Sequence, residues 1–169
     1  MTESILHLLE NLFGTSIFAK CIITLIISMI PIIELRGAIP LGVGILNLPV
    51  YTAMLISLVG NMIPVPLIII FARKIFVWMR KKSRRLGALA DRLENKARTK
   101  GEKLYRGELI GLMIFVAIPL PGTGAWTGAL IAAILNRRLK AALPAIAAGV
   151  VIAGVLVAGI TYGFKSLLN

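Results

Sequence analysis

Two apolar stretches of this chain are each interrupted by prolines and glycines. The first is PIIELRGAIPLGVGIL at 31–46, and the second is PLPGTGAWTGALIAAIL at 119–135. Proline removes a backbone donor and glycine tolerates non-helical backbone, so we expect a helix break in each stretch. Paired breaks of this kind are typical of transporters in which two broken segments face each other near the middle of the bilayer. The pattern therefore predicts a membrane protein with two opposed breaks.

The composition also fits a lipid environment. Hydrophobic residues make up 58% of the chain, and the mean hydropathy is +0.91. Several apolar runs are long enough to cross a bilayer as helices. A soluble core of 169 residues could not bury that much apolar surface. We expect an all-α integral membrane protein.

The net charge of +12 is concentrated in one segment. Residues 80–106 contain eleven Lys or Arg against three acidic residues. The positive-inside rule therefore predicts that this loop lies in the cytoplasm. A nucleic-acid site would need stacking aromatics among the basic residues, and the loop has only Tyr105, so no nucleic-acid partner is expected.

Catalytic and metal chemistry have few candidate residues. Cys21 and His7 are the single cysteine and histidine, which leaves no His/Cys metal site and no intramolecular disulfide. No acid pair is spaced for acid–base work, and no serine lies in a nucleophile motif. The sequence thus predicts a protein that is not an enzyme and that needs no cofactor or metal.

The first half of the chain, residues 1–79, is predicted to hold three membrane elements. An amphipathic pattern at 4–13 predicts an interfacial helix. A re-entrant helical hairpin follows at 17–48, and a spanning helix at 52–79. The basic loop at 80–106 carries a second amphipathic helix, whose apolar face comprises Leu86, Leu89, Leu93 and Ala97.

The second half, residues 107–169, is predicted to hold a hairpin at 109–135 and a spanning helix at 141–164. If residues 109–135 crossed the membrane once, the basic residues that follow them would lie outside, against the charge rule. These basic residues are Arg137, Arg138 and Lys140. A hairpin that returns to its own side removes the conflict, and each of its arms is too short to span alone.

The two halves are expected to form an inverted repeat. Residues 29–31 match residues 117–119 at an offset of 88, and Asn47 and Gly60 match Asn136 and Gly149 at an offset of 89. One hairpin and one spanning helix make an odd number of crossings, so the second copy would be inverted and the hairpin tips would meet. Residues near Asn47 should then be reachable from outside, and residues near Asn136 from inside.

Charged residues in the first hairpin are the strongest site candidates. Glu34 and Arg36 are the acid and the base of its apolar part, and charges inside a membrane are costly unless they are paired or hydrated. Arg36 could contact an anionic head group, and Glu34 could bind a proton or a cation. Alternatively, both could reach the surface or pair for structure alone. Both would point into one cavity only if the backbone unwinds, which Gly37 and Pro40 would permit.

The second hairpin offers polar backbone and few charges. The candidate binding residues here are Pro119, Pro121, Gly122, Thr123, Gly124 and Trp126. A half-helix that begins near Ala125 would direct its N-terminal amides at the membrane midplane, which favours an anion. A tight hairpin tip without a ligand is the alternative. Asn61, beside two prolines of the first spanning helix, is a further candidate because it could help to unwind that helix next to the site.

The segment ELRGAIPLGVG at 34–44, followed by PLPGTGAWTGAL at 119–130, resembles the small multidrug export family, a relative of the DedA membrane proteins. The resemblance implies two inverted re-entrant hairpins and a prokaryotic cytoplasmic (inner) membrane. DedA members are implicated in moving polyprenyl-phosphate carrier lipid and in proton-coupled transport. Unlike the DedA pattern, this chain has no Arg or acid between Pro119 and Asn136.

Three functions remain open from the sequence. The first is a small, proton-coupled transporter with a midplane site that moves an amphipathic lipid phosphate such as polyprenyl (undecaprenyl) phosphate. The second is an exporter of small lipophilic cationic drugs, in which Glu34 supplies the counter-charge. The third is a membrane scaffold without transport. Membrane lipids are expected partners, and a homodimer is expected because four embedded segments give a thin wall around any cavity.

Overall fold

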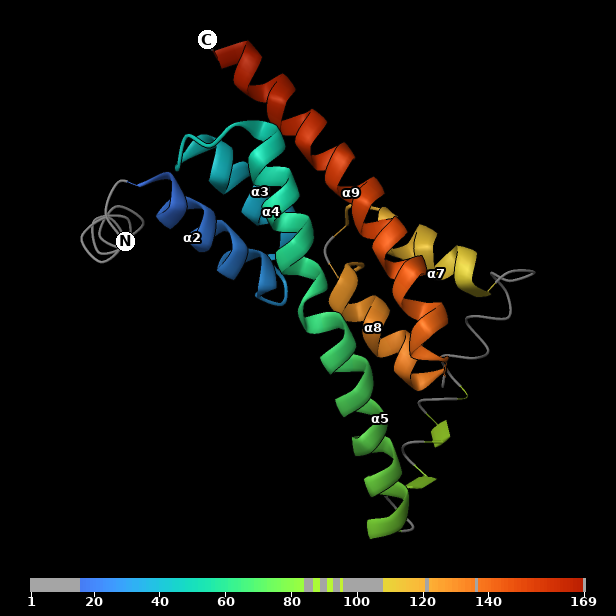
Figure 1. Ribbon diagram of the computed structural model, residues 1–169. Coiled ribbons are helices and arrows are strands. Elements are labelled where there is room, and N and C mark those ends of the chain that lie inside the picture. Colours follow the sequence, from blue (N-terminus) through green and yellow to red (C-terminus); the bar gives the residue numbers. More distant parts are fainter. Residues whose placement is uncertain are drawn as a thin grey trace.

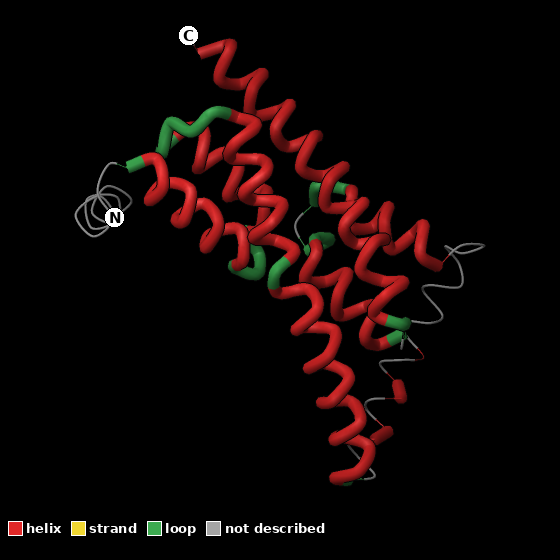
Figure 2. The backbone as a smooth tube through the Cα atoms, in the orientation of Figure 1, coloured by secondary structure: helices red, strands yellow, loops and turns green. Residues whose placement is uncertain are grey.

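The computed structural model describes residues 16–83, 87–88, 91–92, 95, 108–120, 122–135 and 137–168. Every regular element in these ranges is an α-helix (Figure 2), which confirms the all-α prediction for this part of the chain. The predicted interfacial helix at 4–13 lies outside the described residues, and so does most of the amphipathic helix in the basic loop. Pro121 and Asn136 also lie outside them.

The first helical pair consists of α2 (Ile17–Met29) and α3 (Glu34–Gly44). Ser16 caps α2, because its Oγ accepts a hydrogen bond from Ala19 N at 3.4 Å. The break between the helices contains Ile32 at φ +82°, and Glu34 opens α3 at φ +47°. These left-handed conformations reverse the chain within a few residues.

The first long helix is made of α4 (Val50–Met62) and α5 (Pro64–Lys82), with a bend at Ile63. Ile63 keeps helical dihedrals, and its N–H still bonds to Val59 O at 3.2 Å. Pro64 has no N–H to offer to the carbonyl four residues earlier, so the helix kinks here. Together they form an apolar helix of 33 residues at Val50–Lys82, long enough to cross a membrane.

The second half contains α7 (Glu108–Ala117), α8 (Ala125–Ile134) and α9 (Leu139–Leu168). The break between α7 and α8 includes Gly122 at φ +84°, a conformation that glycine adopts without strain. Residues Leu139–Ser166 of α9 form the second apolar helix of membrane-crossing length among the described residues.

The two long helices cross in opposite directions (Figure 1). α2 and α3 pack beside α4, whereas α7 packs beside α9, and α8 packs mainly against α5 and also against α9. The connection from α3 to α4 and the connection from α8 to α9 lie at opposite ends of the molecule, and the two helix breaks lie near its centre. Each half therefore presents a short broken pair of helices and one long helix.

Two glycines make equivalent close contacts in the two halves. A Cβ on Gly60 would lie 2.6 Å from Leu25 O and would overlap Ser28 Oγ, so α4 needs a glycine to approach α2. A Cβ on Gly149 would lie 2.6 Å from Met113 O and 2.7 Å from a Val116 carbon, so α9 approaches α7 in the same way. Each long helix is thus seated on the first helix of its own half by a glycine.

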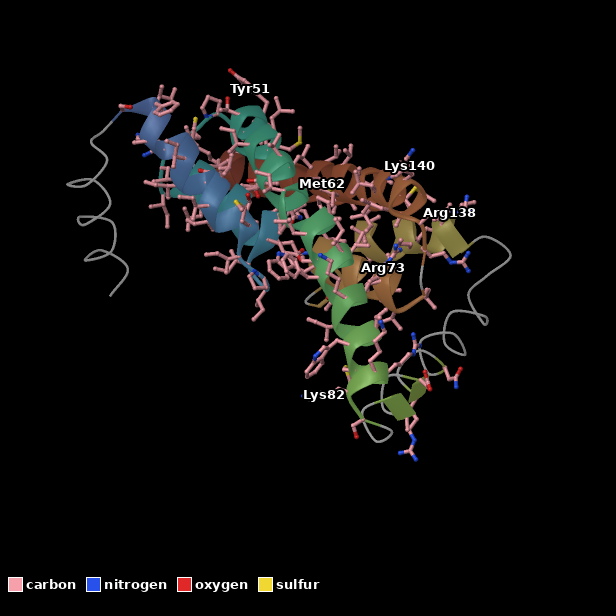
Figure 3. All side chains as sticks on the ribbon, turned by 60° about the horizontal axis from the view of Figure 1, so that its bottom comes forward. Tyr51, Met62, Arg73, Lys82, Arg138 and Lys140 are labelled. Carbon is pink, nitrogen blue, oxygen red and sulfur yellow. The ribbon has the colours of Figure 1, made fainter. Side chains whose placement is uncertain are left out.

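The labelled basic side chains lie toward one end of the molecule. In Figure 3, Tyr51 lies at the start of α4, Met62 lies where α4 meets α5, and Arg73 and Lys82 follow along α5. Arg138 and Lys140, also labelled, lie at the start of α9, away from Tyr51. Arg73, Lys82, Arg138 and Lys140 therefore lie away from Tyr51 in this view.

Candidate functional site

Glu34 lies where the two helix breaks meet. It is the first residue of α3 and is only 5% exposed. Its Oε1 accepts a hydrogen bond from the backbone N–H of Trp126 at 3.2 Å. Because α8 begins at Ala125, this N–H belongs to the first turn, whose amides have no partner within the helix. The carboxylate of one half therefore neutralises the positive end of a helix in the other half.

Gly124 makes room for this contact. A Cβ on Gly124 would overlap the carboxylate of Glu34 at both oxygens and at Cδ. The residue is buried and precedes α8 directly, so a larger side chain has no open side to occupy. The function of this glycine is to let an acid reach the helix terminus.

Arg36 reaches the other side of the same break. Its Nη2 donates to Ile118 O at 3.2 Å and to Thr123 Oγ1 at 3.1 Å. Ile118 directly follows the end of α7, so the guanidinium lies at the negative end of that helix. Thr123 Oγ1 is also 2.7 Å from Ile118 O, and its one proton donates to this carbonyl or to Leu120 O at 2.8 Å.

A third contact joins the breaks through Trp126. The indole Nε1 donates to Met29 O, the last carbonyl of α2, at 3.2 Å. Trp126 therefore holds Glu34 through its backbone and the end of α2 through its ring. Glu34 and Arg36 form no salt bridge with each other in the described part of the chain; each is bound by a different helix end of the second half.

The structure corrects two details of the sequence interpretation. The helix α3 stays regular through Gly37 and Pro40, and Gly37 N bonds to Ile33 O at 3.0 Å. The backbone instead breaks just before Glu34, where positive φ angles turn the chain. At the start of α8, the anion that Trp126 N binds is the protein's own carboxylate, Glu34.

The remaining predicted residues divide into two groups. Pro119, Gly122, Thr123, Gly124 and Trp126 lie in or next to the second break, as Glu34 and Arg36 lie at the end of the first. Pro40 lies elsewhere: it lines a groove of about 470 Å³ between α3 and α9, with Val43, Gly44, Ile160, Thr161, Phe164 and Lys165. Asn61 is fully buried in α4.

Sequence reasoning missed Ser57, which is fully buried one turn before Asn61. Its Oγ and both amide atoms of Asn61 have no hydrogen-bond partner in the described structure. The sequence could have indicated Ser57, because it lies four residues before Asn61 on an apolar helix, and this spacing places both polar side chains on one face. The backbone acceptors Met29 O and Ile118 O were also missed, and no side-chain pattern could have indicated them.

The described structure is all-α, with two helices long and apolar enough to cross a membrane and with charged residues held at paired helix breaks. No group of His, Cys, Asp and Glu suited to a metal ion occurs among the described residues. The chain belongs to the small multidrug export family: a family model with the description "putative small multi-drug export protein" matches residues 34–156. The match begins at Glu34, directly after the first break, and includes the second break. No curated protein and no solved structure matches the chain.

Proposed function

We propose that the protein exports small lipophilic cations, with Glu34 as the counter-charge at a midplane site between the two helix breaks. One observation carries the proposal: Glu34 is a buried acid, and it lies where the two halves meet. A buried carboxylate without a salt-bridge partner is costly in a membrane, so a functional cation is the natural partner. The family description names export of drugs.

The alternative substrate, a phosphate-bearing carrier lipid, has weaker support. A phosphate would need free amides at the start of α8 or a free guanidinium. Trp126 N donates to Glu34, and Arg36 Nη2 donates to Ile118 O and Thr123 Oγ1, while Arg36 Nε has no hydrogen-bond partner in the described structure. A lipid phosphate bound by Trp126 N or by Arg36 Nη2 would have to displace these contacts, whereas a cation would pair with the buried carboxylate itself.

The proposed topology is an inverted repeat of re-entrant hairpins. Three observations support it: the opposite directions of α4–α5 and α9, the equivalent contacts of Gly60 and Gly149, and the breaks that meet at the centre. In this arrangement α2–α3 and α7–α8 enter from opposite sides and return. The basic loop would lie in the cytoplasm of a prokaryotic cell, with two copies of the chain forming a homodimer around a larger cavity.

The proposed cycle uses the contacts at the junction as a gate. A cation that pairs with Glu34 weakens the attraction between this carboxylate and the start of α8, because one charge now serves two partners. The contact between the halves loosens and the site opens to the other side. A proton that binds Glu34 then displaces the cation. When this proton leaves to the opposite side, the carboxylate is regenerated and its contact with Trp126 N is restored. Binding of substrate and proton is thus mutually exclusive.

The test is native mass spectrometry of the purified protein with two probes, a quaternary ammonium compound and a polyprenyl phosphate. The proposal expects quaternary ammonium binding that is lost in Glu34→Gln and kept in Thr161→Val, a polar-to-apolar control on α9. Proteoliposomes should show uptake of the same compound driven by a pH gradient. Lipid-phosphate binding that is lost in Arg36→Ala would favour carrier-lipid transport instead. Variants at Glu34 and Arg36 that change only stability would indicate a scaffold.

A further inference from the structure

The first half of the protein buries four polar side chains between its helices. Thr24 and Ser28 lie on α2, and Ser57 and Asn61 lie on α4; all four are fully buried. We call these four residues the polar cluster. Ser57 Oγ, Asn61 Oδ1 and Asn61 Nδ2 have no hydrogen-bond partner in the described structure. Each such group costs free energy, more so where no bulk water is near, so the cluster needs an explanation.

The second half has apolar residues at all four equivalent positions. The Gly60 and Gly149 contacts define the equivalence: Leu25 and Ser28 on α2 correspond to Met113 and Val116 on α7. With the same offsets, the residues equivalent to the polar cluster are Leu112, Val116, Ile146 and Val150, and all of them are buried. The interface between the first helix and the long helix of a half can therefore be built from apolar side chains alone. The polar cluster is not required to pack α2 against α4.

The polar cluster extends from Thr24, which lies beside Gly42 of α3, to Asn61 at the level of Glu34. α3 and α4 are antiparallel neighbours joined by a short turn, and a Cβ on Gly42 would lie 3.1 Å from Ala53 Cβ. Glu34 lies eight residues from Gly42 along α3, and Asn61 lies eight residues from Ala53 along α4. At the helical rise per residue, both are about 12 Å from the Gly42–Ala53 contact, in the same direction. Ser28 also directly precedes Met29, whose carbonyl binds the Trp126 ring.

We propose that the polar cluster holds water molecules and forms the route by which protons reach Glu34. The donors and acceptors fit water: the amide of Asn61 and the hydroxyl of Ser57 offer both. The hydroxyl protons of Thr24 and Ser28 donate to Lys20 O at 2.8 Å and Leu25 O at 2.7 Å, so these oxygens offer lone pairs to water. A metal cation would leave the amide N–H groups of Asn61 unpaired.

The route is one-sided because the second half closes the equivalent position with apolar side chains. A proton would move from solvent through water in the first half to the Glu34 carboxylate, with no other covalent change. Arg36, on the same helix, also reaches the junction; α2, α4 and α8 contribute no buried charged side chain in the described part, whereas α5, which packs against α8, carries Arg73 with a buried Nε and Nη2. The inference rests on the proposed proton coupling at Glu34, and its test does not require transport.

The experiment measures the rate of hydrogen–deuterium exchange at the Glu34 carboxyl group. Infrared spectroscopy of the whole protein in lipid at acidic pH detects the exchange. The C=O band that is absent in Glu34→Gln identifies the protonated group, and its shift in D₂O reports arrival of a deuteron. The double variant Ser57→Ile/Asn61→Val introduces the side chains of the second half. We expect exchange at least about tenfold slower in this variant, and unchanged exchange in Thr161→Val.

Several results would overturn the inference. Equal exchange rates in the double variant and the wild type would show that protons reach Glu34 by another route. If no C=O band is lost in Glu34→Gln, Glu34 is not protonated under these conditions, and the inference is wrong. Ser57→Ala, which adds no side-chain volume, should keep its free energy of unfolding within about 1 kcal/mol of the wild-type value; a larger loss of stability would assign the hydroxyl a structural role. If the double variant does not fold, Ser57→Ala and Asn61→Ala are measured against the same expectation. If the protein does not bind the quaternary ammonium compound, cation export is refuted. The exchange rates would still show whether protons reach Glu34 through the polar cluster.

Discussion

The contact between Glu34 and the start of α8 predicts that Gly124→Ala is strongly destabilising. The added methyl group would overlap the carboxylate, which must leave its place and lose the hydrogen bond from Trp126 N. A hydrogen bond to a charged group contributes about 1.5–3 kcal/mol to stability. For a chain of this length, about 2 kcal/mol corresponds to a decrease in melting temperature of roughly 4–8 °C.

The assay is thermal unfolding in detergent, followed by tryptophan fluorescence, with Gly159→Ala as the matched control. A Cβ on Gly159 would meet nothing within 4 Å, so this variant gains helix propensity and loses no contact. In a Glu34→Ala background, Gly124→Ala should cost much less, because the overlapping carboxylate is gone. Equal melting temperatures for Gly124→Ala and Gly159→Ala in the wild-type background would refute the reasoning, and so would a full effect without Glu34.

Three further predictions follow from the contacts between helices. Gly60→Ala and Gly149→Ala should each lower the free energy of unfolding by about 1–3 kcal/mol, since each Cβ would lie 2.6 Å from a carbonyl oxygen. Chemical denaturation measures this change, and an effect in only one half would contradict the equivalent packing. Thr123→Val should cost about 1 kcal/mol and weaken the hold on Arg36, whereas Thr123→Ser should retain stability; identical melting curves for both variants would count against the hydrogen bond. In a Cys21→Ser background, Asn47→Cys should react with an impermeant maleimide from outside, and Lys140→Cys from inside; labelling of both from one side would exclude the inverted topology.

Both helix breaks could be predicted from the sequence because their causes are local. Proline lacks an amide hydrogen and glycine tolerates positive φ, wherever the segment finally packs. The breaks occur at the N-terminal ends of the two interrupted stretches, but in the first break the positive φ angles fall on Ile32 and Glu34 and not on a glycine. The kink before Pro64 has the same local origin. Family membership was also accessible, since the motifs at 34–44 and 119–130 lie within the matched region.

The candidate site was only partly predictable. Glu34 and Arg36 stand out in sequence because intramembrane charge is rare. Their partners do not, because Trp126 N and Ile118 O are backbone groups more than eighty residues away. Every residue except proline carries such groups, so no sequence pattern marks the pair that is used. The difference between the polar cluster and its apolar equivalents likewise becomes visible only when Gly60 and Gly149 align the two halves.

Sequence alone therefore determined the helices, their breaks and the rarity of the charges, since these depend on local backbone chemistry and on the cost of charge in lipid. Tertiary structure decided what each charge contacts. Packing brings the start of α8 to Glu34 and the end of α7 to Arg36, so that oppositely charged groups meet across the two halves. The physical reason is that a helix terminus acquires its partner only when the whole chain is folded around it.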